Sequence, residues 1–241
     1  MKANWTAILN KYIHKLVSPD GRQTYESKPD LVNLILELAK LQKTDKVIDL
    51  GCGWGNFLKV CSNFSGEVIG IEPNSDNLKE AANRSGGKNI KYIQGSFENL
   101  NYKDRVNKII SMLAFHQVPW DDKEKALKNI SEVLAQDGYF FLCDTMILFD
   151  PEDDPERFDK VYRYLLKETT PDEIYIKDIE PYLVDSEVYT VNDMRENSPK
   201  DNWFYSIKEV ESWAEHTALK LVKTIELCPF FGVAVFQKKI K

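Results

Sequence analysis

Several features that mark common classes of protein are scarce in this sequence. Only four of the 241 residues are cysteine and three are histidine, and the cysteines lack the paired spacing of a zinc site. The start of the chain lacks the continuous apolar run of a signal peptide or a membrane span. We therefore expect reduced core cysteines, no metal ion, no membrane partner and a cytoplasmic location.

Basic residues are also in the minority. The chain has 32 Lys and Arg against 38 Asp and Glu, which gives a formal net charge of −6. Because affinity for phosphate backbones comes mostly from clustered Lys and Arg, no nucleic-acid partner is expected. The length and the apolar fraction of 43% suffice for one α/β core with an elaboration, but not for two domains of typical size.

The most informative stretch that is present is an apolar run followed by three closely spaced glycines. Residues 46–50 are typical of a buried strand, Gly51, Gly53 and Gly55 follow, and a helix is expected from about residue 54. At the carboxyl edge of a parallel sheet, glycines let backbone N–H groups approach a ligand that a Cβ atom would repel. An ordinary tight connection between strand and helix is the alternative.

A second apolar strand, residues 67–72, ends in the carboxylate of Glu72. A carboxylate at this place can accept hydrogen bonds from both hydroxyls of a ribose. Its separation from the first glycine matches the roughly 20 residues typical of dinucleotide-type folds. Together, the glycines and Glu72 predict a nucleotide-like ligand.

Residues 47–55, Val-Ile-Asp-Leu-Gly-Cys-Gly-Trp-Gly, followed by Ile-Gly-Ile-Glu at 69–72, resemble the first two motifs of class I S-adenosylmethionine-dependent methyltransferases. The resemblance implies S-adenosyl-L-methionine as methyl donor and S-adenosyl-L-homocysteine as product. The glycine spacing differs from the GxGxxG of dehydrogenases, whose last glycine serves a pyrophosphate. Asp49 is expected either to stabilise the turn or to reach the ammonium group of the ligand through water, and Pro73 is expected among the cofactor-binding residues.

Downstream, apolar strands alternate with helices, which predicts a doubly wound, mostly parallel α/β sheet. The resemblance implies seven strands in the order 3-2-1-4-5-7-6, with the last strand antiparallel at the end of a hairpin. The predicted strands are 46–50, 67–72, 90–94, 107–113, 139–143, 219–225 and 231–236, and the predicted helices are about 54–64, 75–84 and 122–136.

We expect three regions in the chain. Residues 1–44 form an N-terminal helical cap, with apolar stripes from Trp5 to Leu16 and from Leu31 to Leu41; residues 45–148 and 206–241 form the Rossmann-like core. Residues 149–205 form an acidic insert after strand 5, with 16 Asp or Glu against 7 Lys or Arg. Helices are expected around 158–166 and 174–183, and after the capping pair Ser206 and Glu209. The insert is a substrate lid, a homodimer interface or a solvated surface.

Further cofactor contacts are expected after the third and fourth strands. Ser96 stands where the resembling family often has an acidic residue that accepts from the adenine amino group, and Phe97 either stacks on the ring or packs in the core. Leu113 and Ala114 are expected to pass under the methionine chain.

His116 and Asp144 are the candidate catalytic residues. Because the ordinary pKa of histidine lies close to physiological pH, its side chain can take a proton from a hydroxyl or an amine. The alternative for His116 is a histidine bonded to its own loop, and the alternative for Asp144 is a helix cap or a surface hydrogen bond. Aromatic residues, Tyr205 among them, either enclose the acceptor or pack in the core. The expected acceptor is a small molecule, neutral or cationic because the insert is acidic. A cofactor-binding subunit without turnover and an NAD(P)-dependent oxidoreductase are the alternative functions.

Overall fold

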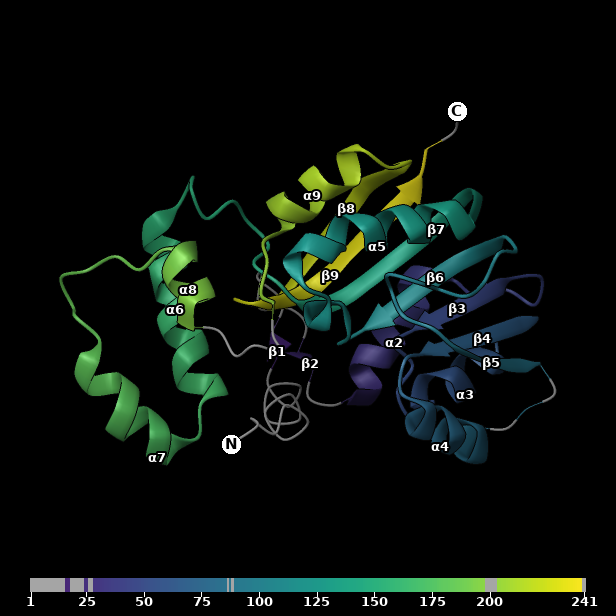
Figure 1. Ribbon diagram of the computed structural model, residues 1–241, viewed down its shortest axis with the longest axis horizontal. Coiled ribbons are helices and arrows are strands. Elements are labelled where there is room, and N and C mark those ends of the chain that lie inside the picture. The colour runs from purple at the N-terminus through teal and green to yellow at the C-terminus, as the bar shows by residue number, and fades with distance from the viewer. Residues whose placement is uncertain are drawn as a thin grey trace.

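The computed structural model describes residues 16–17, 24–25, 28–85, 87, 89–197 and 203–239. Its centre is a seven-stranded sheet in the order β5-β4-β3-β6-β7-β9-β8 (Figure 1). Neighbours from β5 to β7 pair in parallel, and β9 pairs antiparallel with both β7 and β8. The strands are β3 Lys46–Leu50, β4 Glu67–Glu72, β5 Ile90–Gln94, β6 Val106–Met112, β7 Leu134–Thr145, β8 Leu219–Cys228 and β9 Phe231–Lys238. The predicted order 3-2-1-4-5-7-6 is confirmed.

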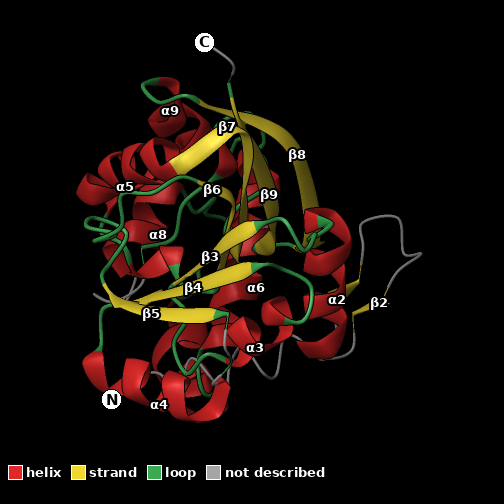
Figure 2. Cartoon of the chain, turned by 90° about the vertical axis from the view of Figure 1, so that its right-hand side faces the viewer, coloured by secondary structure: helices red, strands yellow, loops and turns green. Residues whose placement is uncertain are grey.

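Helices cover both faces of this sheet (Figure 2). They are α2 Lys28–Ala39, α3 Asn56–Ser62, α4 Ser75–Ser85, the short η1 Phe115–Gln117, α5 Trp120–Val133 and α9 Ile207–Glu215. Successive strand residues belong to opposite faces: Val47 packs in one apolar core with α2 and α3, whereas Ile48 packs in a second core with α5 and α9. Burial on both faces explains why the strands have almost continuous apolar sequences.

The junction between α5 and β7 differs from the sequence prediction. The helix ends at Val133 rather than at residue 136, because Leu134 has the extended dihedrals φ −67° and ψ 137° and pairs with Val106 on β6. Asp137, with φ 59°, then turns the chain before Tyr139. An apolar leucine fits a helix face and a strand equally well, so the sequence pattern did not place this boundary.

The N-terminal prediction is corrected at one point. Leu16, expected at the end of a helix, lies in the two-residue strand β1 Leu16–Val17, which pairs antiparallel with β2 Thr24–Tyr25. The remainder of the first predicted helix, from Trp5 onward, lies outside the described residues. The second predicted helix is α2.

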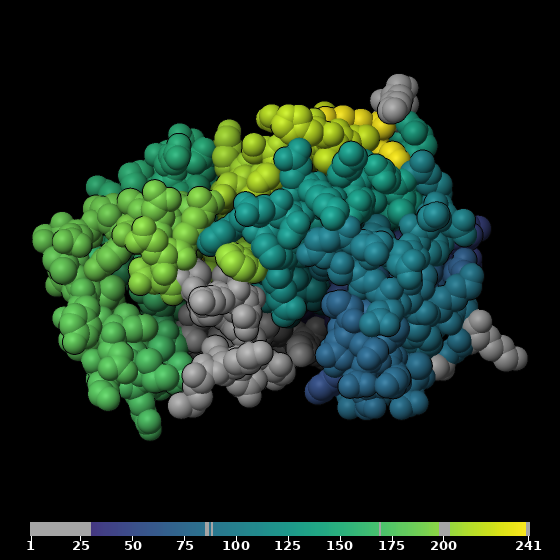
Figure 3. All heavy atoms as spheres, in the orientation of Figure 1, coloured from purple at the N-terminus to yellow at the C-terminus, as the bar shows by residue number. Residues whose placement is uncertain are grey.

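The insert between β7 and α9 forms a helical lobe at the carboxyl edge of the sheet (Figures 1 and 3). Its elements are α6 Pro155–Thr169, α7 Asp172–Ile174, η2 Tyr175–Ile179, η3 Glu180–Tyr182 and α8 Val191–Asn197. The second predicted helix of the insert is thus confirmed as an unbroken helical stretch over 172–182, which changes from α- to π- to 3-10 geometry. Helix α8 was not predicted. Apolar residues of α6 belong to the same core as α2 and α3, so the lobe is packed onto the sheet domain.

Candidate active site

The glycine-rich loop after β3 has an unusual backbone. Gly51, Gly53 and Gly55 have φ angles of 79°, 51° and 75°, in the left-handed region that favours glycine. The N–H groups of Gly51 and Cys52 donate to the carbonyl oxygen of Ile71 at 2.9 and 3.1 Å, which ties the loop to β4. A Cβ on Gly51 would lie 2.4 Å from that of Ala114, whereas one on Gly53 would meet nothing within 4 Å. The loop is therefore packed at Gly51 and open at Gly53.

Glu72 lies at the carboxyl end of β4, next to this open side, and is only 7% exposed. Its Oε2 accepts from the Gly53 N–H at 3.1 Å. Its Oε1 accepts from the Asn74 N–H and from Asn77 Nδ2, both at 3.1 Å. Pro73 follows, and its carbonyl oxygen accepts from the side chain of Gln94. The carboxylate thus lies at the end of its strand, as the sequence predicted, and is held beside the glycine loop.

Asp49 on β3 carries an orphaned carboxylate oxygen. The residue is 3% exposed, and its Oδ2 is buried without a hydrogen-bond partner. Burial, and secondarily the charge of Glu72, raise the pKa of this carboxyl to about 7. A buried acceptor that lacks a donor fits a ligand that brings one, and a cationic donor would satisfy it best.

Ser96 and Phe97 follow β5 as expected. The Ser96 N–H donates to the Asn99 carbonyl oxygen at 2.8 Å, which closes a tight turn. Phe97 is 6% exposed, and its ring packs edge-on against Phe115 with centroids 5.4 Å apart. It also borders Gly51. Phe97 is therefore packed in the core directly beside the glycine loop.

Leu113 and Ala114 lie at the end of β6, against the glycine loop. Leu113 has φ 58°, strained for a non-glycine residue, and its N–H donates to the Cys143 carbonyl oxygen on β7 at 2.8 Å. This bend brings Ala114 over Gly51 and leads directly into η1, which carries His116.

His116 and Asp144, from two neighbouring strand ends, form a buried pair. The Nδ1 atom of His116 lies 2.6 Å from Asp144 Oδ1, and the His116 backbone N–H donates to Oδ2 at 2.7 Å. Burial alone would raise the pKa of Asp144, but His116, the Thr145 N–H and Lys123 lower it below its ordinary value. Asp144 is thus an ionised acceptor that fixes the orientation of the imidazole ring.

Two further residues of this cluster were not singled out as site residues. Tyr205 is fully buried, and its hydroxyl donates to Asp144 Oδ2 at 3.2 Å. Lys123, also fully buried, donates from Nζ to the Phe115 carbonyl oxygen at 2.7 Å and lies 4.3 and 4.4 Å from the Phe115 and Tyr205 ring centroids. Burial lowers its pKa to about 7. Lys123 stands three and four residues before Ala126 and Leu127, so its place on the apolar stripe of α5 was a usable signal.

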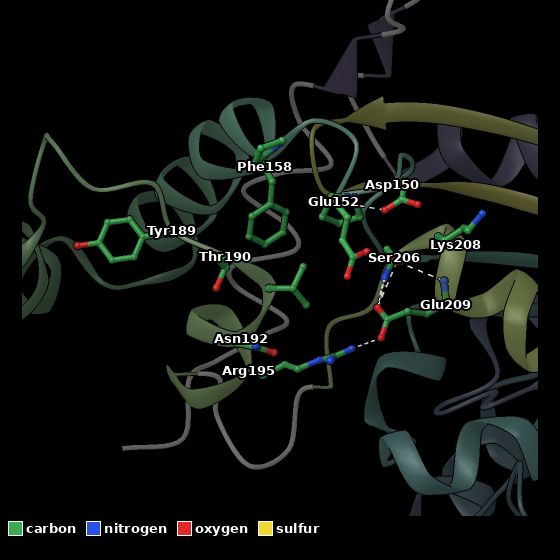
Figure 4. Close-up of a pocket in the computed structure, with 13 residues that line it drawn as sticks. Asp150, Glu152, Phe158, Tyr189, Thr190, Asn192, Arg195, Ser206, Lys208 and Glu209 are labelled. Carbon is green, nitrogen blue, oxygen red and sulfur yellow. Dashed lines mark hydrogen bonds and ion pairs between the residues drawn. The ribbon is translucent and has the colours of Figure 1, made fainter.

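A pocket of about 490 Å³ lies between the insert and α9 (Figure 4). Phe158 and Val191 supply apolar walls, Asp150 and Glu152 supply carboxylates, and Arg195 forms an ion pair with Glu209 on the core side. The wall residue Ser206 follows Tyr205, which contacts Asp144. Along the chain, one pocket-lining residue is therefore the direct neighbour of a residue that contacts Asp144.

Comparison with known proteins gives the family of this site. Residues 47–138, which include the glycine loop, Glu72 and His116, match the model of a methyltransferase-domain family. They form a class I S-adenosylmethionine-dependent methyltransferase domain. Glycines with left-handed backbone, the acidic end of β4 and the orphaned Asp49 oxygen all lie within this methyltransferase domain, and they fit the ribose and ammonium groups of that cofactor.

Individual relatives agree with this assignment. The chain is 33% identical over 123 residues to an uncharacterized methyltransferase of Oceanobacillus iheyensis, covering 51% of this chain and 57% of that one. It is 30% identical over 169 residues to a probable S-adenosylmethionine-dependent methyltransferase of Saccharomyces cerevisiae, covering 66% and 54%. The chain thus spans a little over half the length of these relatives.

Among solved structures, a cyclopropane synthase from Mycobacterium tuberculosis has the same fold. The TM-score is 0.59 at 16% identity, over 88% of this chain and 68% of that one. Within the described residues, no helix has the length and apolar character needed to cross a bilayer, and no group of three His, Cys, Asp or Glu is arranged to hold a metal ion.

Proposed function

We propose that this protein transfers the methyl group of S-adenosylmethionine to a small-molecule acceptor. One observation carries the proposal: a loop open at Gly53, a buried Asp49 oxygen without a donor and the Glu72 carboxylate meet at one edge of the sheet of a methyltransferase domain. Glu72 would bind the ribose and Asp49 the ammonium group, with Ser96, Phe97, Leu113 and Ala114 along the adenosyl and methionine parts.

When bound, the cofactor would supply a methyl group on a positively charged sulfur. The acceptor attacks the methyl carbon in line with the carbon–sulfur bond, and the sulfur leaves with the rest of the cofactor. This reaction asks the protein mainly for positioning and for exclusion of water. His116 would remove the proton of the acceptor. Because the ionised Asp144 accepts from Nδ1–H, the basic nitrogen of the neutral ring is Nε2. Asp144 therefore acts through His116, as the group that sets its tautomer.

The insert would act as a lid that selects a neutral or cationic acceptor. Three carboxylates, of Asp150, Glu152 and Glu209, line the pocket between the insert and α9 against two basic side chains, and the insert as a whole has a formal charge of −9. An anionic acceptor would be repelled in such a site. A screen of matched amine, alcohol and carboxylate acceptors, read out as S-adenosylhomocysteine formed, tests this selection; preference for carboxylates would contradict it.

Calorimetry tests the cofactor assignment directly. S-adenosylmethionine and S-adenosylhomocysteine are expected to bind and NAD is not. Glu72→Ala should lose charge-assisted hydrogen bonds to the ribose, each worth about 1.5 to 3 kcal/mol, and so weaken binding by at least tenfold. An exposed carboxylate on the neighbouring helix provides the control, Asp76→Ala, which should leave binding unchanged.

The alternatives give different results in these measurements. Tight binding of NAD in place of S-adenosylmethionine would indicate an oxidoreductase. Cofactor binding without turnover over all acceptor classes would indicate a non-catalytic subunit. Unchanged cofactor binding by Glu72→Ala would refute the ribose role of Glu72.

A further inference from the structure

The Glu72 carboxylate is almost saturated with hydrogen bonds from the protein itself. A carboxylate has about four lone-pair positions, two on each oxygen. Oε1 accepts from both Asn74 N–H and Asn77 Nδ2, and Oε2 accepts from Gly53 N–H. One position, on Oε2, is left for a ligand. A ribose that offers two hydroxyls would bring the number of donors to five, one more than Glu72 can accept.

One of the three protein donors must therefore give way. The N–H groups of Gly53 and Asn74 belong to the backbone of the glycine loop and of the turn before α4, and both segments are fixed by further hydrogen bonds. The side-chain amide of Asn77 is the only one of the three that can leave by rotation about single bonds.

The orientation of the Asn77 amide is determined by its second neighbour. The indole Nε1–H of Trp54 donates to Asn77 Oδ1 at 2.9 Å. Because indole is a donor only, the oxygen of the amide must face Trp54 and its NH₂ group must face Glu72. Trp54 lies in the glycine loop, is 52% exposed and has the Arg84 guanidinium 4.8 Å from its ring centroid. A rotation of Asn77 away from Glu72 thus changes the environment of an exposed tryptophan.

We propose that Asn77 is a placeholder for one ribose hydroxyl. Its amide occupies Oε1 of Glu72, leaves when S-adenosylmethionine binds, and returns when that hydroxyl is missing. This inference rests on the proposed function, because it assumes that Glu72 binds the cofactor ribose. It assigns Asn77 and Trp54 to the cofactor site as residues that adjust the acceptor capacity of Glu72.

A thermodynamic cycle tests the exchange. Calorimetry would compare S-adenosylhomocysteine with its 2′-deoxy and 3′-deoxy forms on wild type and on Asn77→Ala. In the wild type, loss of the hydroxyl that replaces Asn77 should weaken binding by less than about threefold, because the amide refills the position; in Asn77→Ala the same loss should cost about tenfold or more. S-adenosylhomocysteine itself should bind Asn77→Ala no more weakly than wild type.

A second variant and a second signal guard against side effects. Asn77→Leu keeps a side chain of similar size without the donor, so it should repeat the result of Asn77→Ala. S-adenosylhomocysteine should change the tryptophan emission of wild type, and Trp54→Phe should abolish that change. An emission spectrum that the ligand leaves unaltered would contradict the rotation of Asn77.

The outcomes separate this inference from the function on which it rests. If S-adenosylhomocysteine does not bind wild type, the proposed function fails and the placeholder role with it. If it binds, but both deoxy forms lose the same factor in wild type and in the Asn77 variants, only the placeholder role is wrong. Equal weakening of all three ligands by Asn77→Ala would instead show that Asn77 merely supports Glu72.

Discussion

Asp49 is a buried carboxylate that suits the binding of a cationic group but destabilises the folded chain. Its side chain is buried beside Glu72, and its Oδ2 has no donor. An unpaired carboxylate in such a place destabilises the folded chain unless it is protonated or satisfied by a ligand. The methyltransferase domain thus holds a charge whose partner would arrive with the cofactor.

The pH dependence of stability should reveal this charge. The pKa of Asp49 is raised to about 7, so between its ordinary value and 7 the folded chain keeps a proton that the unfolded chain has released. The free energy of unfolding therefore contains its full contribution from Asp49 at low pH, and this contribution is lost as the pH rises toward 7. Asp49→Asn, which keeps the shape without the charge, should be more stable than wild type by a few kcal/mol at about pH 8 and by much less at about pH 4.5.

Urea denaturation at both pH values measures the effect. Asp76→Asn alters an exposed carboxylate and should show no such pH-dependent gain. Equal stability of Asp49→Asn and wild type at the higher pH would mean that the Asp49 charge is already compensated in the folded protein.

The places in the fold of the residues proposed to bind the cofactor could be predicted from the sequence, whereas their mutual contacts could not. The glycines and Glu72 stand at strand ends, where local pattern alone indicates a ligand. The bond between His116 and Asp144 depends on β6 and β7 being neighbours, which is a property of the sheet order. The hydrogen bonds that fill Glu72 involve Asn77, an ordinary polar residue of a helix, and nothing in its sequence context distinguishes it.

Among the elements, α9 has a start that the sequence marks by a specific motif, the capping pair Ser206 and Glu209. Ser206 accepts from the Glu209 N–H at 3.2 Å, and Glu209 accepts from the Ser206 N–H at 2.9 Å, so the predicted capping box is formed. The same Glu209 side chain is the partner of Arg195 on α8. The helix cap thus also fastens the insert to the core.

Variants at this cap should separate its two roles. Ser206→Ala removes the side-chain acceptor and should lower the free energy of unfolding by about 1 kcal/mol. Glu209→Gln retains an oxygen for the Ser206 N–H and loses the ion pair with the partly exposed Arg195, so it should cost less than Ser206→Ala. Chemical denaturation measures both, and a larger loss for Glu209→Gln would show that the contact with the insert dominates.

Elements of the core were easier to predict than elements of the insert for a physical reason. Strands β3 and β4, covered on both faces, need apolar residues throughout, and their bounds agree with the prediction. In the insert, the helical stretch over 172–182 was expected as one helix, but its changes of geometry were not, and Ile176 and Tyr182 on it are exposed. Periodicity is most informative where one side of a long element is buried, so it did not find the seven-residue helix α8.

In the whole molecule, the insert shares the core of the domain that carries it. Phe158, Val161 and Leu165 on α6 belong to the same apolar cluster as Val47 on β3 and Leu31 on α2. On the other side, Arg157 of α6 forms an ion pair with Glu226 of β8. A lobe attached in this way cannot unfold alone without exposing part of the main core.

The chain should therefore unfold in one cooperative transition. Far-UV circular dichroism, which reports on all helices and strands, and tryptophan fluorescence should give the same midpoint in urea. Phe158→Ala, which removes a buried ring between the lobe and the core, should shift both midpoints together by an amount equivalent to about 3 to 5 kcal/mol. Two separated transitions in the wild type would show that the lobe is an independent unit.

The position of β5 and β8 at the two ends of the strand order has a consequence for behaviour at high concentration. An outermost strand offers unpaired backbone groups to any other chain that approaches it. Here Lys91 on β5 and Lys220 and Lys223 on β8 are exposed, and the pairing of β8 with β9 is irregular at two places. The exposed lysines and the irregular β8 hinder a second molecule from adding a strand to either edge of the sheet. The protein should therefore resist edge-to-edge aggregation even at high concentration.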